Sequence, residues 1–388
     1  MVLPAKATQD LASLKSTVET TSTLLVQLQS TSAWDSETTE QANNIDALNL
    51  AYDAASLIKA HSTKLSLLII NKPFTASAIS TVLRELGSGP LPGLASAIEL
   101  CHPKKYTRVM SSEVEWKARK VFIELGALVA AIPLDGKILS DDQKNGTGAE
   151  KGKGSLANTA VIWKACDEVM ALKSLGVVGL VIRKADEYRA LLKDALEELQ
   201  EWRDEESDGE GDDEGDSGDD TTEMSAQEAV DNIFGSQRHI PADDPEKITP
   251  RLDTTQKRLR LIILMYQAVV KRRFKALPLL PQSDLPPELE EKSSKARGII
   301  SCLDEVLLSL KAIPDITDEL ASAFYDLDVA EIDTRMGQCF SKGVAAADLL
   351  MTNWVGEKDE FSTWVSQSQL QLFSILIEAG NQISGSYE

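Results

Sequence analysis

The sequence predicts an all-α protein made of long antiparallel helices in one or two bundles of four- or five-helix type, with no β-sheet. Apolar residues recur at intervals of three and four in six segments, which places them on one face of a helix in each. No segment shows the sustained apolar–polar alternation of a strand. Aromatic residues make up only 5% of the chain, so aliphatic side chains must form most of the core.

The predicted helices follow one another along the chain. Pro73 and Pro133 end the second and third of them, because proline inside a helix removes a backbone hydrogen bond. Between the helices, Gly87–Gly93 predicts a turn, and the glycine-rich stretch 135–155 predicts a flexible loop. The apolar seams of the six helices cover residues 11–28, 48–69, 114–132, 181–202, 289–310 and 361–379.

About half of the formal charge of −21 lies in one short run. Between Asp204 and Asp220, 11 of the 17 residues are acidic and none is basic. Such a run repels itself and cannot pack, so we expect it to be disordered and extended. The predicted organisation is an N-terminal helical bundle (1–202), an acidic disordered linker with a short helix (203–249), and a C-terminal helical bundle (250–388).

Composition also bears on location and partners. The first ten residues lack the charged-then-apolar pattern of a secretory signal, and no apolar run approaches the roughly 18 to 20 residues of a membrane span. We therefore expect a cytoplasmic and nuclear protein without a membrane partner. A net acidic chain is also a poor general binder of nucleic acid, so we expect no direct nucleic-acid contact.

The residues that usually carry chemistry form no recognisable constellation. The four cysteines have no short spacing, which argues against a zinc site or a disulfide framework. Cys101 and His102 are adjacent, but neighbouring side chains on a helix point about 100° apart, a poor geometry for activating a thiol. We therefore expect no enzyme activity, no cofactor and no small-molecule substrate.

The densest basic cluster consists of Lys271, Arg272, Arg273 and Lys275. Three interpretations remain open: a solvated helix face, a nuclear-import-like or anion-binding patch, and an internal partner for the acidic run. Within that run, Ser207 and Ser217 are each followed three residues later by an acidic residue, a pattern that acid-directed kinases favour. They are either phosphorylation sites or inert spacer residues.

The most distinctive segment of the chain is 159–202. It contains Ile162, Trp163, Cys166 and Asp167, then Lys-Asp-Ala at 193–195 and two glutamates before the acidic run. This pattern resembles the GCIP family, the cyclin-D-binding-protein-like (Grap/cyclin-D-interacting) proteins, of which the chain is identified as a distant member. A second resembling segment begins at Ile313.

The resemblance implies an all-helical, non-enzymatic protein that binds partner proteins in cell-cycle or transcription control. The alternative is a vinculin- or catenin-like helical scaffold or adaptor. Trp163, Cys166 and Met170 share one helix face, and with Asp167 they are either core residues or part of a partner groove. A groove of this kind would receive an amphipathic partner helix.

Overall fold

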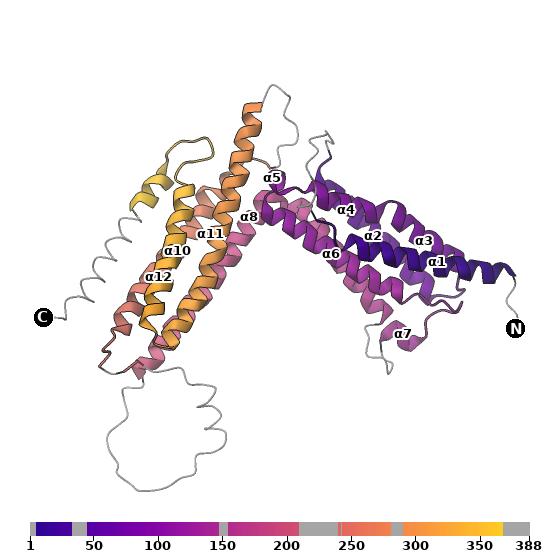
Figure 1. Ribbon diagram of the computed structural model, residues 1–388, viewed down its shortest axis with the longest axis horizontal. Helices are drawn as coiled ribbons and strands as arrows, with labels where there is room; N and C mark the ends of the chain where they lie inside the picture. The colour runs from indigo at the N-terminus through magenta and orange to yellow at the C-terminus, as the bar shows by residue number, and fades with distance from the viewer. Residues whose placement is uncertain are drawn as a thin grey trace, which may run out of the picture. The chain divides into compact units, whose positions relative to one another are not determined.

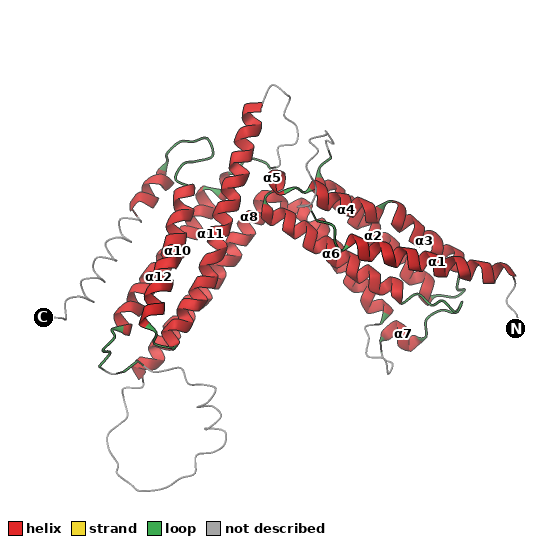
Figure 2. Cartoon of the chain, viewed as in Figure 1, coloured by secondary structure: helices red, strands yellow, loops and turns green. Residues whose placement is uncertain are grey.

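The computed structural model describes residues 5–32, 45–146, 154–208, 240–241, 243–280 and 290–367, with the backbone alone at 205–208 and 290–297. Within these residues the chain forms helices and no strand, which confirms the predicted all-α fold; Figure 2 draws the helices in red. The elements, labelled in Figure 1, are α1 (Ala5–Leu28), α2 (Ala47–Ile70), α3 (Ala76–Ser88), α4 (Pro90–Leu100), α5 (Pro103–Tyr106), α6 (Arg108–Ala130), α7 (Asp141–Asn145), α8 (Ser155–Asp208), α10 (Ile248–Arg272), η2 (Phe274–Ala276), α11 (Glu290–Tyr325) and α12 (Val329–Leu349).

The chain divides into two compact units, and the division falls inside α8. The first unit comprises residues up to Leu180 together with Leu279–Ser301, and the second comprises Val181–Pro278 and the residues from Cys302 onward. The sequence predicts the domain boundary near Trp202 instead. The predicted and observed boundaries differ because the apolar seam of α8 continues through both units, so the seam does not reveal which helices α8 packs against.

Two features of α8 differ from the sequence expectation. The helix is interrupted at Gly176, whose φ of 62° and ψ of 178° are not helical. At its other end, Asp204–Asp208 are helical, although the acidic run was expected to be extended from its first residue. A helix that is already formed and packed extends into a charged segment at little cost, because nucleation is the expensive step. The remaining extent of the predicted linker stays a prediction.

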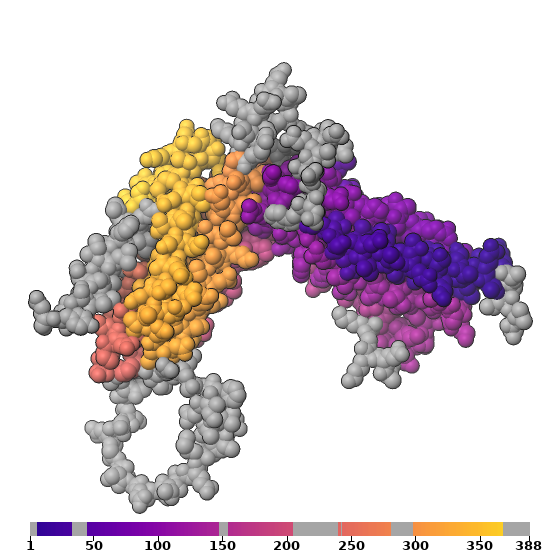
Figure 3. All heavy atoms as spheres, in the orientation of Figure 1, coloured from indigo at the N-terminus to yellow at the C-terminus, as the bar shows by residue number. Residues whose placement is uncertain are grey.

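In the first unit, α1 packs against α3 and α6, and α2 packs against α4 and α3. Side chains fill the spaces between these ribbons, as the space-filling view shows (Figure 3). The seam positions predicted for α2 and α6 are buried, as the period of three and four requires. Fully buried side chains of this core include Leu14, Ile58, Leu65, Ile79, Leu83, Val121, Phe122 and Leu125.

Two segments predicted as irregular are partly helical. The turn expected over Gly87–Gly93 is reduced to Gly89, because Pro90 stands at the first position of α4, where a missing N–H costs nothing. The loop expected over 135–155 contains α7, which Ser140 and Gln143 start with a reciprocal capping box. Residues 147–153 of that loop lie outside the described residues.

In the second unit, the later part of α8 packs with α10, α11 and α12. Gln256 donates a hydrogen bond to the Leu199 carbonyl, and Arg203 pairs with Asp253, so α8 and α10 are antiparallel. Residues paired between α10 and α12 instead increase together along both helices, so these neighbours are parallel. The pairs are Arg251 with Asp333, Thr255 with Met336, and Arg273 with Leu350. Successive helices of this unit run antiparallel, as predicted, and α10 and α12 are parallel because α11 lies between them in the sequence.

α11 continues as one helix through Pro314. A proline inside a helix leaves the carbonyl four residues earlier without its intrahelical donor, here the carbonyl of Leu310. The buried Tyr266 hydroxyl of α10 donates to that carbonyl at 2.5 Å. Tertiary packing therefore supplies the hydrogen bond that proline removes.

Some predicted elements extend outside the described residues. Of the last seam, 361–379, the structure describes the residues up to Gln367, in which Phe361 and Val365 are buried as predicted. The short helix expected between residues 203 and 249 lies in the part of the chain that the structure does not describe.

Candidate partner-binding surface

The motif around Trp163 lies where the first part of α8 runs antiparallel to α2. The Trp163 indole N–H donates to the Thr63 hydroxyl at 2.9 Å. One turn further along α8, both carboxylate oxygens of Asp167 accept from the Lys59 ammonium, at 2.6 and 2.8 Å. Two of the predicted site residues are therefore fixed to α2 by polar contacts at the surface.

The apolar residues of the motif do not share one environment. Cys166 is fully buried, whereas Trp163 is 39% exposed and Met170 is half-buried. At 100° per residue, Trp163 and Met170 lie about 20° apart around α8, and Cys166 lies about 60° from Trp163 on the side of Met170. Cys166 is therefore a core residue, and Trp163 lies at the border between core and solvent, where it contacts α2 and also remains accessible.

Exposed aromatic side chains border α8 on both sides. On α2, Tyr52 is 39% exposed and lies under the Lys173 ammonium of α8, 4.6 Å from the ring centre. On α6, Trp116 is 57% exposed, with the Lys117 and Lys120 ammonium groups 5.0 and 5.7 Å from its ring centre. Lysines over ring faces are cation–π contacts, which hold both partners in place at a solvent-facing site.

Ion pairs tie α6 to α8 as they tie α2 to α8. Lys120 reaches Glu168 at 3.2 Å, while the preceding residue, Asp167, pairs with Lys59 on the opposite flank. Consecutive positions of a helix diverge by about 100°, so these two carboxylates face opposite neighbours. We call this surface the aromatic face: Tyr52, Lys59, Trp116, Lys120, Trp163, Asp167 and Lys173.

The thiols are not activated. Burial raises the pKa of both Cys101 and Cys166 to about 12, so neither is a thiolate near neutral pH. The His102 ring accepts a hydrogen bond from the Lys104 backbone N–H and begins α5. Cys101 is therefore a core residue, and His102 is a helix cap.

The basic cluster is not one solvated face. Lys271, Arg272 and Lys275 are exposed, but Arg273 is fully buried. Its guanidinium makes two hydrogen bonds to Asp359, at 2.7 and 2.9 Å, donates to the Leu350 carbonyl and lies over the Phe361 ring. The sequence did not reveal this because the partner carboxylate lies 86 residues later in the chain.

The remaining sequence predictions concern two serines, metal sites and membrane-spanning helices. Ser207 lies in the last turn of α8, where only the backbone is described, and Ser217 lies outside the described residues. In the described ranges, no cluster of three or more His, Cys, Asp or Glu side chains could hold a metal ion. None of the helices described is long and apolar enough to cross a membrane.

Sequence reasoning identified Trp163 and Asp167 but missed their partners and the other two aromatic residues. Trp116 gave a usable signal, since it stands in the charged stretch Glu-Val-Glu-Trp-Lys, off the apolar seam of α6. Tyr52 and Lys59 gave none, because they are ordinary polar-face residues of α2 until α8 lies beside them.

The fold and the aromatic face define the class: an all-helical protein that presents tryptophan and tyrosine side chains among fixed charges. Residues 52–205 match the model of a family described as Grap2 and cyclin-D-interacting, N-terminal. This match includes the Trp163 motif and supports the resemblance of the chain to this family.

The chain is also similar to one curated protein. The chain is 24% identical over 229 residues to an uncharacterized protein of Schizosaccharomyces pombe. The alignment covers 59% of this chain and 62% of that protein, so the chain spans less than two thirds of its relative. No solved structure matches the chain.

Proposed function

We propose that this protein is a non-enzymatic regulatory module that binds partner proteins through the aromatic face and requires no cofactor. The observation that carries the proposal is the 57% exposure of Trp116, beside a half-exposed Trp163 on the neighbouring helix α8. Both residues, together with Tyr52, lie inside the segment that matches the family. The description of that family names an interaction with cyclin D and no reaction.

The physical case rests on what these side chains do at interfaces. Tryptophan and tyrosine are enriched among the residues that dominate binding energy, because they remove a large apolar area from water with few rotatable bonds to fix. On the aromatic face they are held in advance by a hydrogen bond or by lysines, which lowers the ordering cost of binding. An amphipathic partner helix lying along α8 would contact both flanks.

The partner we propose is a regulator of the cell cycle or of transcription, and the first candidate is a cyclin of the D type. We propose that binding takes place in the cytoplasm or nucleus. The support is the family description together with the paired charges of the aromatic face. Lys59–Asp167 and Lys120–Glu168 give the surface both signs of charge, which favours a protein partner over a polyanion.

The test is direct binding of a purified D-type cyclin to the full chain and to single variants. Trp116→Ala and Trp163→Ala should each weaken binding about 30-fold, the typical effect of removing a dominant interface residue. Leu308→Ala is the matched control, because Leu308 is 65% exposed on α11 and belongs to the second unit, so its loss should not change affinity.

Melting curves of the same variants separate binding from folding. The Trp116→Ala variant should have the same melting temperature as the unchanged chain, because a ring that is more than half exposed contributes little to the core. Equal affinity of the chain and both tryptophan variants would exclude the aromatic face. Co-sedimentation of the chain with actin filaments, without cyclin binding, would favour the scaffold alternative instead.

A further inference from the structure

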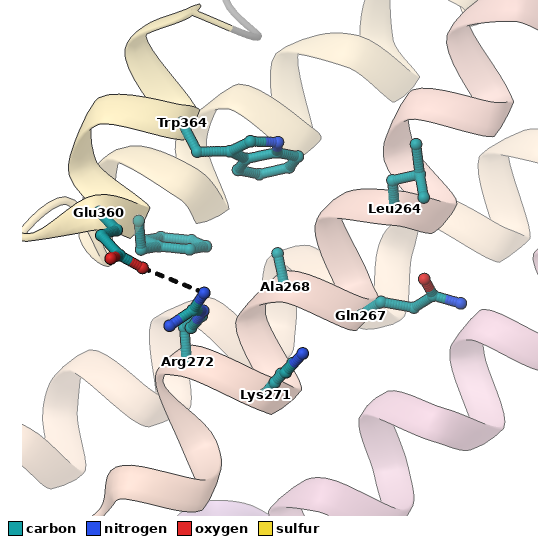
Figure 4. A pocket seen from close by; sticks show the side chains of 8 residues that line it. Leu264, Gln267, Ala268, Lys271, Arg272, Glu360 and Trp364 are labelled. Carbon is teal, nitrogen blue, oxygen red and sulfur yellow. Dashed lines mark ion pairs between the residues drawn. The ribbon is translucent and has the colours of Figure 1, made fainter.

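A groove of about 450 Å³ opens on the second unit between α10 and the helical turn at residues 360–367. Figure 4 shows Trp364 opposite Ala268 and Leu264 of α10, with Lys271 and Arg272 on the α10 side. Leu264 is 50% exposed, which leaves an apolar side chain in the middle of an otherwise polar helix face. The groove therefore has an apolar centre and a basic end.

Beyond Asp253, the charged side chains exposed on α10 are all cations. Residues 254–276 contain no Asp or Glu, in a chain whose net charge is −21. Arg272 pairs at 3.1 Å with Glu360, whose side chain is 84% exposed, and the described residues give the other four cations no ion-pair partner. The exposed cations of this stretch are Lys257, Arg260, Lys271, Arg272 and Lys275.

The helix dipole accounts for only part of this pattern. Lys271 and Arg272 stand in the last turn of α10, where cations are favoured in any helix. Lys257 and Arg260 are in the first half of α10, where the dipole offers no such stabilisation. A face that contacts only solvent also does not account for the apolar side chains of Leu264 and Trp364, which lie between the two pairs of cations.

We propose that α10 and this groove bind an acidic amphipathic helix of a partner protein. Lys257 and Lys271 are fourteen residues apart, about 21 Å along the helix axis, so a partner of about four turns spans them. Its apolar side chains lie against Leu264, Ala268 and Trp364, and its carboxylates at both ends meet the cations. Charge complementarity selects the partner and speeds encounter.

This surface is separate from the aromatic face, although it extends the same proposed role in protein binding. The aromatic face belongs to α2, α6 and the first part of α8, whereas the groove belongs to α10 and residues 360–367. Cyclin binding that does not depend on α10 would leave the aromatic face standing when the groove proposal fails. Peptide binding by a chain that binds no cyclin would show the reverse.

The probe is a synthetic amphipathic helical peptide of about 16 residues, with leucines on one face and paired glutamates at each end. Fluorescence polarisation with the full chain should give a dissociation constant on the order of 10 μM at low salt. Affinity should fall as salt is raised, because exposed charge pairs are screened. A peptide with glutamine at every glutamate position should bind at least about tenfold more weakly.

Variants locate the site. The double substitution Lys257→Glu with Lys271→Glu, and separately Leu264→Gln, should each weaken binding at least about tenfold. Both change exposed side chains, so melting should be unaffected. Lys311→Glu, an exposed charge reversal on α11, is the matched control and should bind the peptide as the unchanged chain does.

Several results would overturn the proposal. They are absence of peptide binding, equal binding by the groove variants, and binding of phosphatidylserine vesicles or duplex DNA in place of the peptide. Binding only by a chain that lacks residues 209–220 would show that the acidic run of the protein itself occupies the groove, and would replace the partner with an internal one.

Discussion

Two buried arginines of the second unit, Arg258 in α10 and Arg273 directly after it, differ in how well their guanidinium groups are satisfied. Arg273 satisfies its guanidinium with Asp359 and the Leu350 carbonyl. Arg258 is 2% exposed and lies over the Phe340 ring, but its Nε and Nη2 groups have no hydrogen-bond partner. Burial lowers the pKa of Arg258, which reflects the cost of keeping that cation out of water.

We predict that replacing the two arginines has unequal effects on stability. Arg273→Met leaves Asp359 without its cation and should cost about 3 kcal/mol, the low end for a broken buried pair because Asp359 is partly exposed. Arg258→Met removes two unpaired donors and should change stability by less than about 1 kcal/mol or increase it. Hydrogen exchange of α10 backbone amides measures both. Equal losses would mean that Arg258 is as well satisfied as Arg273.

The same pair predicts a pH dependence. Hydrogen bonds donated by Arg273 hold the pKa of Asp359 well below its ordinary value. A carboxyl whose folded pKa is lowered stabilises the fold above its unfolded pKa of about 3.9, and this contribution is lost as the pH falls below that value. Asp359→Asn should therefore be destabilising at pH 7, with the difference shrinking below about pH 4.

Urea unfolding at pH 7 and pH 3 measures this difference. Glu357→Gln changes an exposed carboxylate of the same loop and serves as the control, with similar stability at both pH values. A penalty for Asp359→Asn that is as large at pH 3 as at pH 7 would contradict the role of Arg273 in lowering this pKa.

At the scale of elements, single residues decide where helices stop or continue. Pro314 does not end α11, because Tyr266 of α10 bonds the carbonyl that proline leaves free. Gly176 interrupts α8 although no proline is near, through a backbone conformation that only glycine adopts readily. The first effect depends on a neighbouring helix, and the second on the absence of a Cβ.

We predict opposite results from alanine at two glycines. A Cβ at Gly176 or Gly126 would meet no atom within 4 Å, so neither substitution creates a clash with its surroundings. Gly176→Ala should still destabilise by about 1–3 kcal/mol, because of its positive φ. Gly126→Ala, inside α6, should stabilise by about 0.5–1 kcal/mol. Thermal unfolding measures both changes in stability. A Gly176→Ala variant as stable as the unchanged chain would show that α8 can be a regular helix at this residue.

At the scale of the whole molecule, charge is distributed in two ways. The acidic run between Asp204 and Asp220 carries about half of the net charge and follows the packed part of α8, whereas the exposed charges of α10 beyond Asp253 are all basic. Overall acidity therefore describes neither of the two proposed binding surfaces. The aromatic face carries paired charges of both signs, and the groove on α10 is cationic.

The sequence predicted the fold class and the seams of α1, α2, α6, the later part of α8 and α11, because the period of three and four is a local property of each segment. It also predicted Trp163 and Asp167 as site residues and the resemblance to a family whose model matches residues 52–205. It could not separate Cys166 from Trp163 by environment, since both lie on one ridge of α8 and only the position of α2 decides which of them is covered.

The sequence by itself determined an all-helical chain, a concentrated acidic run and a family motif, because composition and periodicity are read one segment at a time. Only the tertiary structure decided that α10 and α12 are parallel neighbours, that Arg273 is a buried partner of Asp359, and that Tyr52 and Trp116 border α8 on its two sides. Each of these depends on which distant segments meet, and pairing between distant helices leaves no periodic signal in either one.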